Sequence, residues 1–385
     1  MARGSLTRAP AVVAGAGLAA LAVAMGIGRF AFTPILPMMQ IDLGMSVAQG
    51  GWLASMNYLG YLLGALSATV MRPRPTTAIR GALTVTGLVT FAMALTHTPA
   101  AWAVLRAVAG VASAWVLVFA SSWCLERLAP VGRPVLQGVV FAGVGVGIAV
   151  AGGFCLAIMQ REASSAAAWA GLGVLSLVVT ALTWPVFRDA EDAAAPTARA
   201  RATARAWSAD RVRLVACYGT FGFGYIIPAT FIPVMAREIV HDPSVFGWAW
   251  PVFGVAAAAS TLAAGLLGRF VGHRRLWALS HVLMALGVVL PLVAPGIVGI
   301  LGAAVLVGGT FMVATMAGMQ EARRVGAGHA TVLMGAMTAA FAAGQIVGPL
   351  VVSHLASAGG GFSGALLVAG ALLLITAAML FRRPP

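Results

Sequence analysis

The sequence has very little charge and no lysine. Charged residues make up only 9% of its 385 residues and hydrophobic residues 61%, whereas roughly a quarter of the residues of a soluble domain are charged. Such a chain cannot cover a folded surface with polar groups, so lipid is its expected solvent. The net charge of +14 comes from arginines. They lie in short segments between apolar runs, which indicates membrane topology rather than nucleic-acid binding.

Cysteine and buried acids are also scarce. The three cysteines, Cys124, Cys155 and Cys217, form no CxxC pair and no metal-ligand spacing, so neither a disulfide framework nor a metal site is predicted. None of the ten Asp and Glu residues lies inside an apolar run. Because no nucleophile and base are paired either, we expect no enzyme activity and no cofactor.

Twelve apolar runs follow one another along the chain. A membrane-spanning helix needs about 20 such residues, and only helices satisfy their own backbone hydrogen bonds within such segments. The predicted fold class is therefore an all-α membrane protein with twelve transmembrane helices. The runs are 11–38, 46–70, 79–97, 100–124, 135–158, 168–187, 212–235, 246–268, 276–294, 296–320, 331–356 and 363–381.

The arginines predict how the chain is oriented. Twenty of the 24 fall on the side of the membrane that holds both termini, and two, Arg161 and Arg237, fall on the other side. The remaining two, Arg29 and Arg106, lie inside apolar runs. Because arginine-rich loops stay in the cytoplasm, we expect both termini there.

The chain contains nearly the same helix twice. Residues 26–39 read GIGRFAFTPILPMM and residues 222–235 read GFGYIIPATFIPVM. Shifts of 195 to 197 residues superimpose Gly26 on Gly222, Pro37 on Pro233, Gly51 on Gly247, Glu126 on Glu321 and Gly138 on Gly335. The sequence therefore predicts two six-helix bundles, 1–187 and 214–385, joined by a cytoplasmic linker at 188–213. The axis that relates the two bundles should run along the membrane normal. Superposing the bundles should place Arg29 on Tyr225.

Local motifs resemble those of the major facilitator superfamily. Arg106 and Gly110 resemble its R-x-x-x-G motif, and the segment Gly265–Arg275 resembles its G-x-L-x-D-R-x-G-R-R gating motif, with Arg269 in place of the acid. The antiporter motif G-x8-G-x3-G-P is matched in the eleventh run by Gly335, Gly344, Gly348 and Pro349. The segments GIGRFAFTPILP and FAAGQIVGP further resemble the YbfB-like branch, which is largely without a known substrate.

This resemblance implies the twelve-helix major facilitator fold with both termini inside. It also implies a multi-pass protein of the bacterial cytoplasmic (inner) membrane that acts as a secondary transporter by alternating access. Prolines interrupt helix hydrogen bonding, so those of the first and seventh runs are expected to act as pivots beside the motif residues. The expected gating residues are Gly265, Gly272, Arg274, Pro34, Pro37, Pro228 and Pro233.

Arg29 and Arg106 are the strongest candidates for contacting a solute. A charge at the membrane centre costs about 2.5–3.5 kcal/mol or more, so it usually faces a cavity or a partner. At 1.5 Å per residue the two lie about 14 and 9 Å from the outer ends of their runs, which is a comparable depth. Two guanidiniums at one level suit a carboxylate or phosphate. The alternative is structural: each arginine bonds helix carbonyls and holds spans together.

Uncharged polar residues near mid-span complete the candidate site. Asn57, Gln345 and Tyr225 can contact a solute, or they can hydrogen-bond between helices. Tyr58 and Tyr61 belong to the same group. The superfamily's proton-coupled members commonly use a buried carboxylate, which no run contains here.

Other polar and aromatic residues have simpler interpretations. His281 and His354 can titrate, although solvation near a helix end is the simpler interpretation of both. Trp248 and Trp250 fit the interfacial aromatic belt.

Three functions remain open. Arg29 and Arg106 favour transport of a small organic anion. The antiporter-like glycines and 17 methionines, which give adaptable apolar walls, favour an efflux antiporter for hydrophobic compounds. The departures in the gating loops favour a membrane receptor or assembly protein that transports nothing. The expected partners are a small-molecule substrate and membrane lipid, without nucleic acid, and we expect a monomer.

Overall fold

The structure is a computed structural model that describes residues 9–71, 73–188, 207–239, 248–267, 270–294, 296–326, 329–357 and 361–382. Every regular element in these ranges is a helix. Most of the predicted linker at 188–213, the aligned Gly247 and the motif residue Arg269 lie outside the described residues.

Six helical segments precede the linker. The first consists of α1 (Pro10–Leu21), the π-helical segment η1 (Ala22–Ile27) and α2 (Phe32–Asp42) in succession. Proline in the first turn, where its missing N–H breaks no hydrogen bond, starts four of the helices. The other segments are α3 (Val47–Val70), α4 (Pro75–Ala92) with η2 (Met93–Leu95), α5 (Pro99–Leu128) with η3 (Ala129–Val131), α6 (Pro134–Met159) and α7 (Ser165–Thr183).

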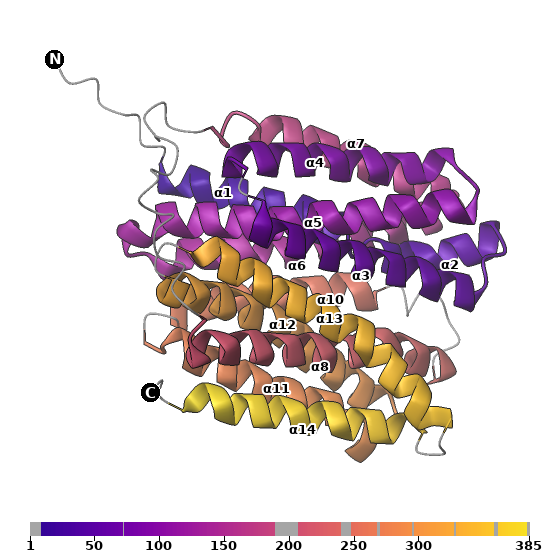
Figure 1. Cartoon of the computed structure of the whole chain (residues 1–385). Coiled ribbons are helices and arrows are strands. Elements are labelled where there is room, and N and C mark those ends of the chain that lie inside the picture. The colour runs from indigo at the N-terminus through magenta and orange to yellow at the C-terminus, as the bar shows by residue number, and fades with distance from the viewer. Residues whose placement is uncertain are drawn as a thin grey trace.

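Six more segments follow the linker. Figure 1 shows them as a second group of helices beside the first, with α10 and α13 next to the first group and both chain ends on the same side. They are α8 (Ala209–Ile239), α10 (Ala249–Leu267), α11 (His273–Val293), α12 (Ile297–Gly326), α13 (Ala330–Ser357) and α14 (Gly361–Phe381).

Eleven of the twelve described segments are long and apolar enough to cross a membrane. The remaining one, α3, has 24 residues, or about 36 Å at 1.5 Å per residue, so it is also long enough. It is less apolar because it carries Gln49, Asn57, Tyr58 and Tyr61. The prediction of twelve helices is confirmed, and the polar residues of α3 lie beside the site described below.

The two groups of helices meet mainly through α6 with α10 and through α3 with α13. Gly138, Gly145 and Gly152 recur every seven residues along the face of α6 that meets α10. A side chain at Gly145 would overlap the backbone of α10 at Gly254, so only glycine permits this close approach. Gly335 of α13 lies in the same way against α3.

A second glycine stripe on α6 packs against the first segment. Gly143 faces the backbone of Leu18, and Gly147 faces that of Gly26. Helix packing is therefore the role of most of the glycines on α6. Gly153 is an exception, because a side chain there would meet open space.

The prolines affect the first and seventh segments differently. The first segment is interrupted by a turn at residues 28–31, just before Pro34 and Pro37. In contrast, α8 runs without a break through Pro228 and Pro233. The prolines of the seventh segment therefore remove single backbone bonds without interrupting the helix, which a packed membrane helix tolerates, and their role as pivots stays a prediction.

An ion-pair cluster joins the ends of α8, α11 and α12 on the face that bears the chain termini. Arg274 pairs with both Asp210 and Glu321, and Arg324 pairs with Glu321 at 2.7 Å. Because α12 continues to Gly326, beyond the apolar run that ends at 320, Glu321 lies inside the helix with its side chain 1% exposed. The cluster ties three helices of the second group together.

We expect Glu321→Gln to destabilise the protein by up to about 3–5 kcal/mol, because breaking a buried ion pair leaves charge uncompensated. Thermal unfolding of the purified protein should show a lower apparent melting temperature. The repeat provides a control in Glu126, which aligns with Glu321 but is exposed. Glu126→Gln should change stability by less than about 0.5 kcal/mol. Equal melting temperatures for the two variants would contradict a bracing role for the cluster.

Candidate functional site

The site begins with an irregular stretch of backbone in the first segment. Gly28 N donates to Val23 O at 2.8 Å and Phe30 N to Met25 O at 3.1 Å, so these bonds span five residues instead of four. Pro34 has no N–H to donate to the carbonyl four residues earlier. The helix therefore opens between Gly28 and Ala31, and Arg29 lies in this opening.

Side chains of α5 satisfy the carbonyls that this opening exposes. Arg106 donates from Nη1 to Gly28 O at 3.0 Å and from Nη2 to Arg29 O at 3.1 Å. Ser113 Oγ, also on α5, donates to Ala24 O at 2.7 Å. Asn57 of α3 in turn donates from Nδ2 to the Arg106 carbonyl at 2.9 Å. Arg106 therefore holds the backbone of Arg29 in place, as the structural alternative from the sequence describes. Because both Nη atoms of Arg106 bind backbone carbonyls, this geometry does not support a solute bound by the guanidiniums of both Arg29 and Arg106.

Arg29 is buried between the two groups of helices. Its side chain is 3% exposed, and its Cζ lies 3.8 Å from the ring centroid of Tyr61 and 5.3 Å from that of Tyr58. Its Nη2 donates to Gln345 Oε1 on α13. Cation–π contacts and a single neutral acceptor therefore surround this charge, and the Gln345 bond crosses from one group of helices to the other.

Several polar atoms around Arg29 have no hydrogen-bond partner among the described residues. They are Arg29 Nε and Nη1, Gln345 Nε2, Asn57 Oδ1 and Arg106 Nε. Each edge of a guanidinium combines Nη2 with either Nε or Nη1, and Gln345 occupies only one of the two hydrogens of Nη2. One edge of Arg29 is therefore free to bind a carboxylate through two parallel hydrogen bonds.

No acid forms an ion pair with this charge in the described part of the chain. The ion pairs found there all belong to Arg213, Arg274 and Arg324 at the termini-bearing ends of helices. Neither Arg29 nor Arg106 forms one within the described residues. The centre of the molecule thus holds two buried guanidiniums close together, at the comparable depth that the sequence predicts.

Tyr225, the predicted repeat counterpart of Arg29, belongs to an aromatic cluster. Its ring stacks on Phe311 with a centroid distance of 5.1 Å and lies 6.1 Å from Phe341. Phe311 and Phe341, together with Phe30 and Tyr61, line a central cavity of about 20 Å³. The cavity has room for about one water molecule, so the halves are closed around the centre.

Trp250 packs inside the molecule and not at the membrane interface, where the sequence predicts it. Its ring lies 6.5 Å from Phe30 and stacks on Phe253 at 5.3 Å. Its Nε1 is buried without a hydrogen-bond partner among the described residues. Trp248 is 58% exposed, as an interfacial residue should be. Residues two apart lie on different faces of a helix, so their spacing already indicated that the two tryptophans have different surroundings.

The other predicted gating residues lie away from Arg29. Gly265 packs against Gly138 where α10 meets α6, and Gly272 directly precedes α11. Arg274 belongs to the ion-pair cluster. These positions hold the termini-bearing ends of helices together, and the gating role of these residues stays a prediction.

His281 is buried, contrary to the solvation expected from its place in the sequence. It is 0% exposed, its Nε2 accepts from Trp277 Nε1 at 2.8 Å, and its Nδ1 lies 2.9 Å from Thr376 Oγ1. Both ring nitrogens are used by neutral partners, which favours a structural role. His354 lies outside the described side chains. In the described part of the chain, no three His, Cys, Asp or Glu side chains could share a metal ion.

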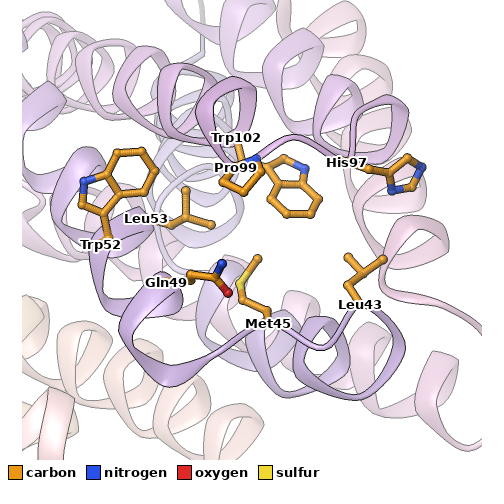
Figure 2. A pocket seen from close by; sticks show the side chains of 8 residues that line it. All are labelled: Leu43, Met45, Gln49, Trp52, Leu53, His97, Pro99 and Trp102. Atoms are coloured by element: carbon orange, nitrogen blue, oxygen red, sulfur yellow. The ribbon is translucent and has the colours of Figure 1, made fainter.

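A larger cavity of about 290 Å³ lies at the opposite end of the molecule from the termini. Figure 2 shows Trp52, Trp102 and His97 around it, with Gln49 and Met45 below. Two of its lining residues, Leu53 and Trp102, precede Asn57 and Arg106 by four residues each, which is one helical turn or about 6 Å. The cavity therefore ends one turn from the residues that hold Arg29.

Comparison with known proteins agrees with this architecture. A family model described as "Uncharacterised MFS-type transporter YbfB" matches residues 21–381. The fold is similar to the "Crystal structure of a Major Facilitator Superfamily (MFS) transporter, FucP, in the outward conformation", with a TM-score of 0.73 and 12% sequence identity over 97% of this chain and 100% of that chain. At this identity the likeness shows the fold alone. A search of curated proteins found no match.

If Arg106 holds the first segment open, Arg106→Gln should leave carbonyls of Gly28 and Arg29 unsatisfied. Each costs about 1–3 kcal/mol when buried, so the apparent melting temperature of the purified protein should fall clearly. Arg161→Gln, at an exposed position on the opposite side from the termini, is the control and should have little effect. An Arg106→Gln protein as stable as the control would show that these carbonyls do not depend on the guanidinium.

Proposed function

The chain belongs to the family described as uncharacterised MFS-type transporter YbfB, and from this membership we propose that it carries a small organic anion across the bacterial cytoplasmic (inner) membrane by alternating access. The family and the fold make it a multi-pass membrane transporter rather than an enzyme. The class of solute and the membrane are our inference from the sequence and the site.

The free edge of the Arg29 guanidinium carries the proposal. A buried cation without an acid beside it is expensive in a membrane protein and usually marks a solute or ion pathway. Arg29 Nε and Nη1 are buried without partners among the described residues. An anion bound there would satisfy the charge and the donors at the same time, and a carboxylate fits the fork geometry of the guanidinium.

The neighbours of Arg29 support binding of a solute between the halves. Gln345 Nε2 is a further unpaired donor on α13, opposite Arg29. Arg106 and Asn57 orient the site from α5 and α3. A solute that touches Arg29 and Gln345 contacts both groups of helices at once, which is the arrangement that alternating access requires.

The closed packing around the centre fits a carrier rather than a channel. A cavity of about 20 Å³ is much smaller than the roughly 300 Å³ of a typical small-molecule site, so a solute can enter only when the halves separate on one side. The α6–α10 glycine stripe permits close contact between the halves through backbone and small side chains.

The remaining assignments follow the sequence. We place the termini-bearing face in the cytoplasm because 20 of 24 arginines are predicted on that side. We further propose two six-helix repeats, 1–187 and 214–385, a monomer in contact with lipid, and no cofactor or metal.

Efflux of hydrophobic compounds is a second candidate, favoured by the aromatic walls of the central cavity. It explains those walls but leaves the charge of Arg29 without a role. A lipophilic cation would be repelled by the two buried guanidiniums. Binding of neutral lipophilic compounds in preference to anions would favour this candidate.

The test of the anion proposal is a thermal-shift screen of the purified protein with organic acids and neutral lipophilic compounds, followed by measurement of affinity. An anion that binds the folded state raises the apparent melting temperature. Arg29→Gln should weaken its binding by about 1.5–3 kcal/mol, the range for a charge-assisted hydrogen bond. Arg29→Lys should recover part of this, because an ammonium lacks the bidentate fork.

Arg80 offers a matched control. Its Cζ also lies over an aromatic ring, 5.0 Å from the centroid of Trp184, and its Nη2 donates to Trp184 O at 3.0 Å, so its contacts differ from those of Arg29. Arg80→Gln should leave anion affinity unchanged. The proposal would be overturned if Arg29→Gln lowered the melting temperature of the ligand-free protein while the surviving fraction bound the anion normally.

A further inference from the structure

Aromatic rings form most of the wall beside Arg29. The central cavity is lined by Phe30, Tyr61, Tyr218, Phe311 and Phe341, together with Thr315 and aliphatic residues. Tyr61 is also the ring on which the Arg29 guanidinium lies. Tyr61 and Phe30, which both line the cavity and lie beside the guanidinium, therefore connect Arg29 with the aromatic wall.

Phe30 connects the charge with rings of the other group of helices. It follows Arg29 in the chain, and Arg29 Cζ lies 5.6 Å from its centroid. Its ring meets Phe311 edge to face, with 6.2 Å between centroids and 81° between planes. Phe30 comes from the first group of helices and Phe311 from α12 in the second, so this aromatic contact closes when the two halves meet.

Trp250 lies next to this wall, with its ring centroid 6.5 Å from that of Phe30. Its ring stacks parallel to Phe253, with 5° between planes, and Phe253 in turn stacks on Phe311 at 5.4 Å. Trp250 Nε1 is buried and has no partner among the described residues. An indole N–H is a donor only, and buried ones normally find an acceptor. A polar substituent on a bound solute would provide one.

We propose that the transported anion is an aromatic carboxylate. Its carboxylate binds the free edge of Arg29, and its ring packs edge to face against Phe30 and Phe311. The unpartnered Trp250 N–H donates a hydrogen bond to a hydroxyl or similar group on the ring. This inference rests on the proposed function, in which Arg29 binds an organic anion. Aromatic rings prefer such edge-to-face contacts to contacts with saturated groups, because their edges and faces carry opposite partial charge.

Two carboxylates of nearly equal size distinguish the contribution of the aromatic ring to binding from that of the charge. Benzoate and cyclohexanecarboxylate carry the same anionic group, but only benzoate has a π system. Benzamide has the ring of benzoate without its charge. Titration calorimetry of the purified full-length protein at pH 7 should show benzoate binding roughly three- to tenfold more tightly than cyclohexanecarboxylate, the ratio expected from one good aromatic contact. Benzamide should bind far more weakly than either.

Substitutions then locate the preference. Phe311→Leu should reduce the benzoate-to-cyclohexanecarboxylate ratio to about one. Phe119→Leu is the control, because Phe119 is a buried ring on α5 that packs on Trp115 and does not line the cavity. Phe30→Leu serves the same purpose if Phe311→Leu does not yield folded protein. Trp250→Phe should weaken 4-hydroxybenzoate more than benzoate, because it keeps a ring and removes the N–H.

The outcomes distinguish this inference from the proposed function. Equal affinity for benzoate and cyclohexanecarboxylate, or a preference that survives both Phe311→Leu and Phe30→Leu, would overturn the aromatic class while leaving an anion transporter. Binding of other organic acids, but of neither benzoate nor cyclohexanecarboxylate, would also overturn the aromatic class. Failure of every organic acid to bind through Arg29 would overturn the proposed function itself.

Discussion

The buried charge of Arg29 is the constraint on which the rest of the centre depends. A guanidinium placed where the described residues offer no acid must be held by other means. The chain supplies the ring of Tyr61 beneath it and the amide oxygen of Gln345 across from it. Its own backbone sits in a helix opening whose carbonyls are satisfied by Arg106. These contacts orient the cation without neutralising it, which leaves its charge for an anion.

The same arrangement links recognition of a solute to the movement of the halves. Arg29 and Phe30 belong to the first group of helices, whereas Gln345 and Phe311 belong to the second. A solute between them would replace contacts that now join the halves directly. Glycines along α6 let these halves approach closely, and the ion pairs of Arg274 keep three helices of the second group together. The second group is thus suited to move as one body.

The sequence was sufficient for features that depend on composition along one helix. The twelve segments and the comparable depth of Arg29 and Arg106 follow from run lengths and spacing. Features that depend on how helices rotate against one another were not accessible. The sequence could not show that Arg106 donates its hydrogen bonds to carbonyls of the first segment, or that Trp250 faces inward. Nor could it show that Glu321 pairs with Arg274 or that His281 lies against Thr376, because these partners are distant in the chain.

The most direct test of the account is anomalous diffraction from crystals of the protein grown with 4-bromobenzoate. The carboxylate and the bromine mark the two ends of one small ligand. The account predicts a bromine peak within the cavity lined by Phe30 and Phe311, with the carboxylate against the guanidinium of Arg29. A bromine peak in the outer cavity beside Trp52 and Trp102, with the Arg29 guanidinium free of the ligand, would contradict it.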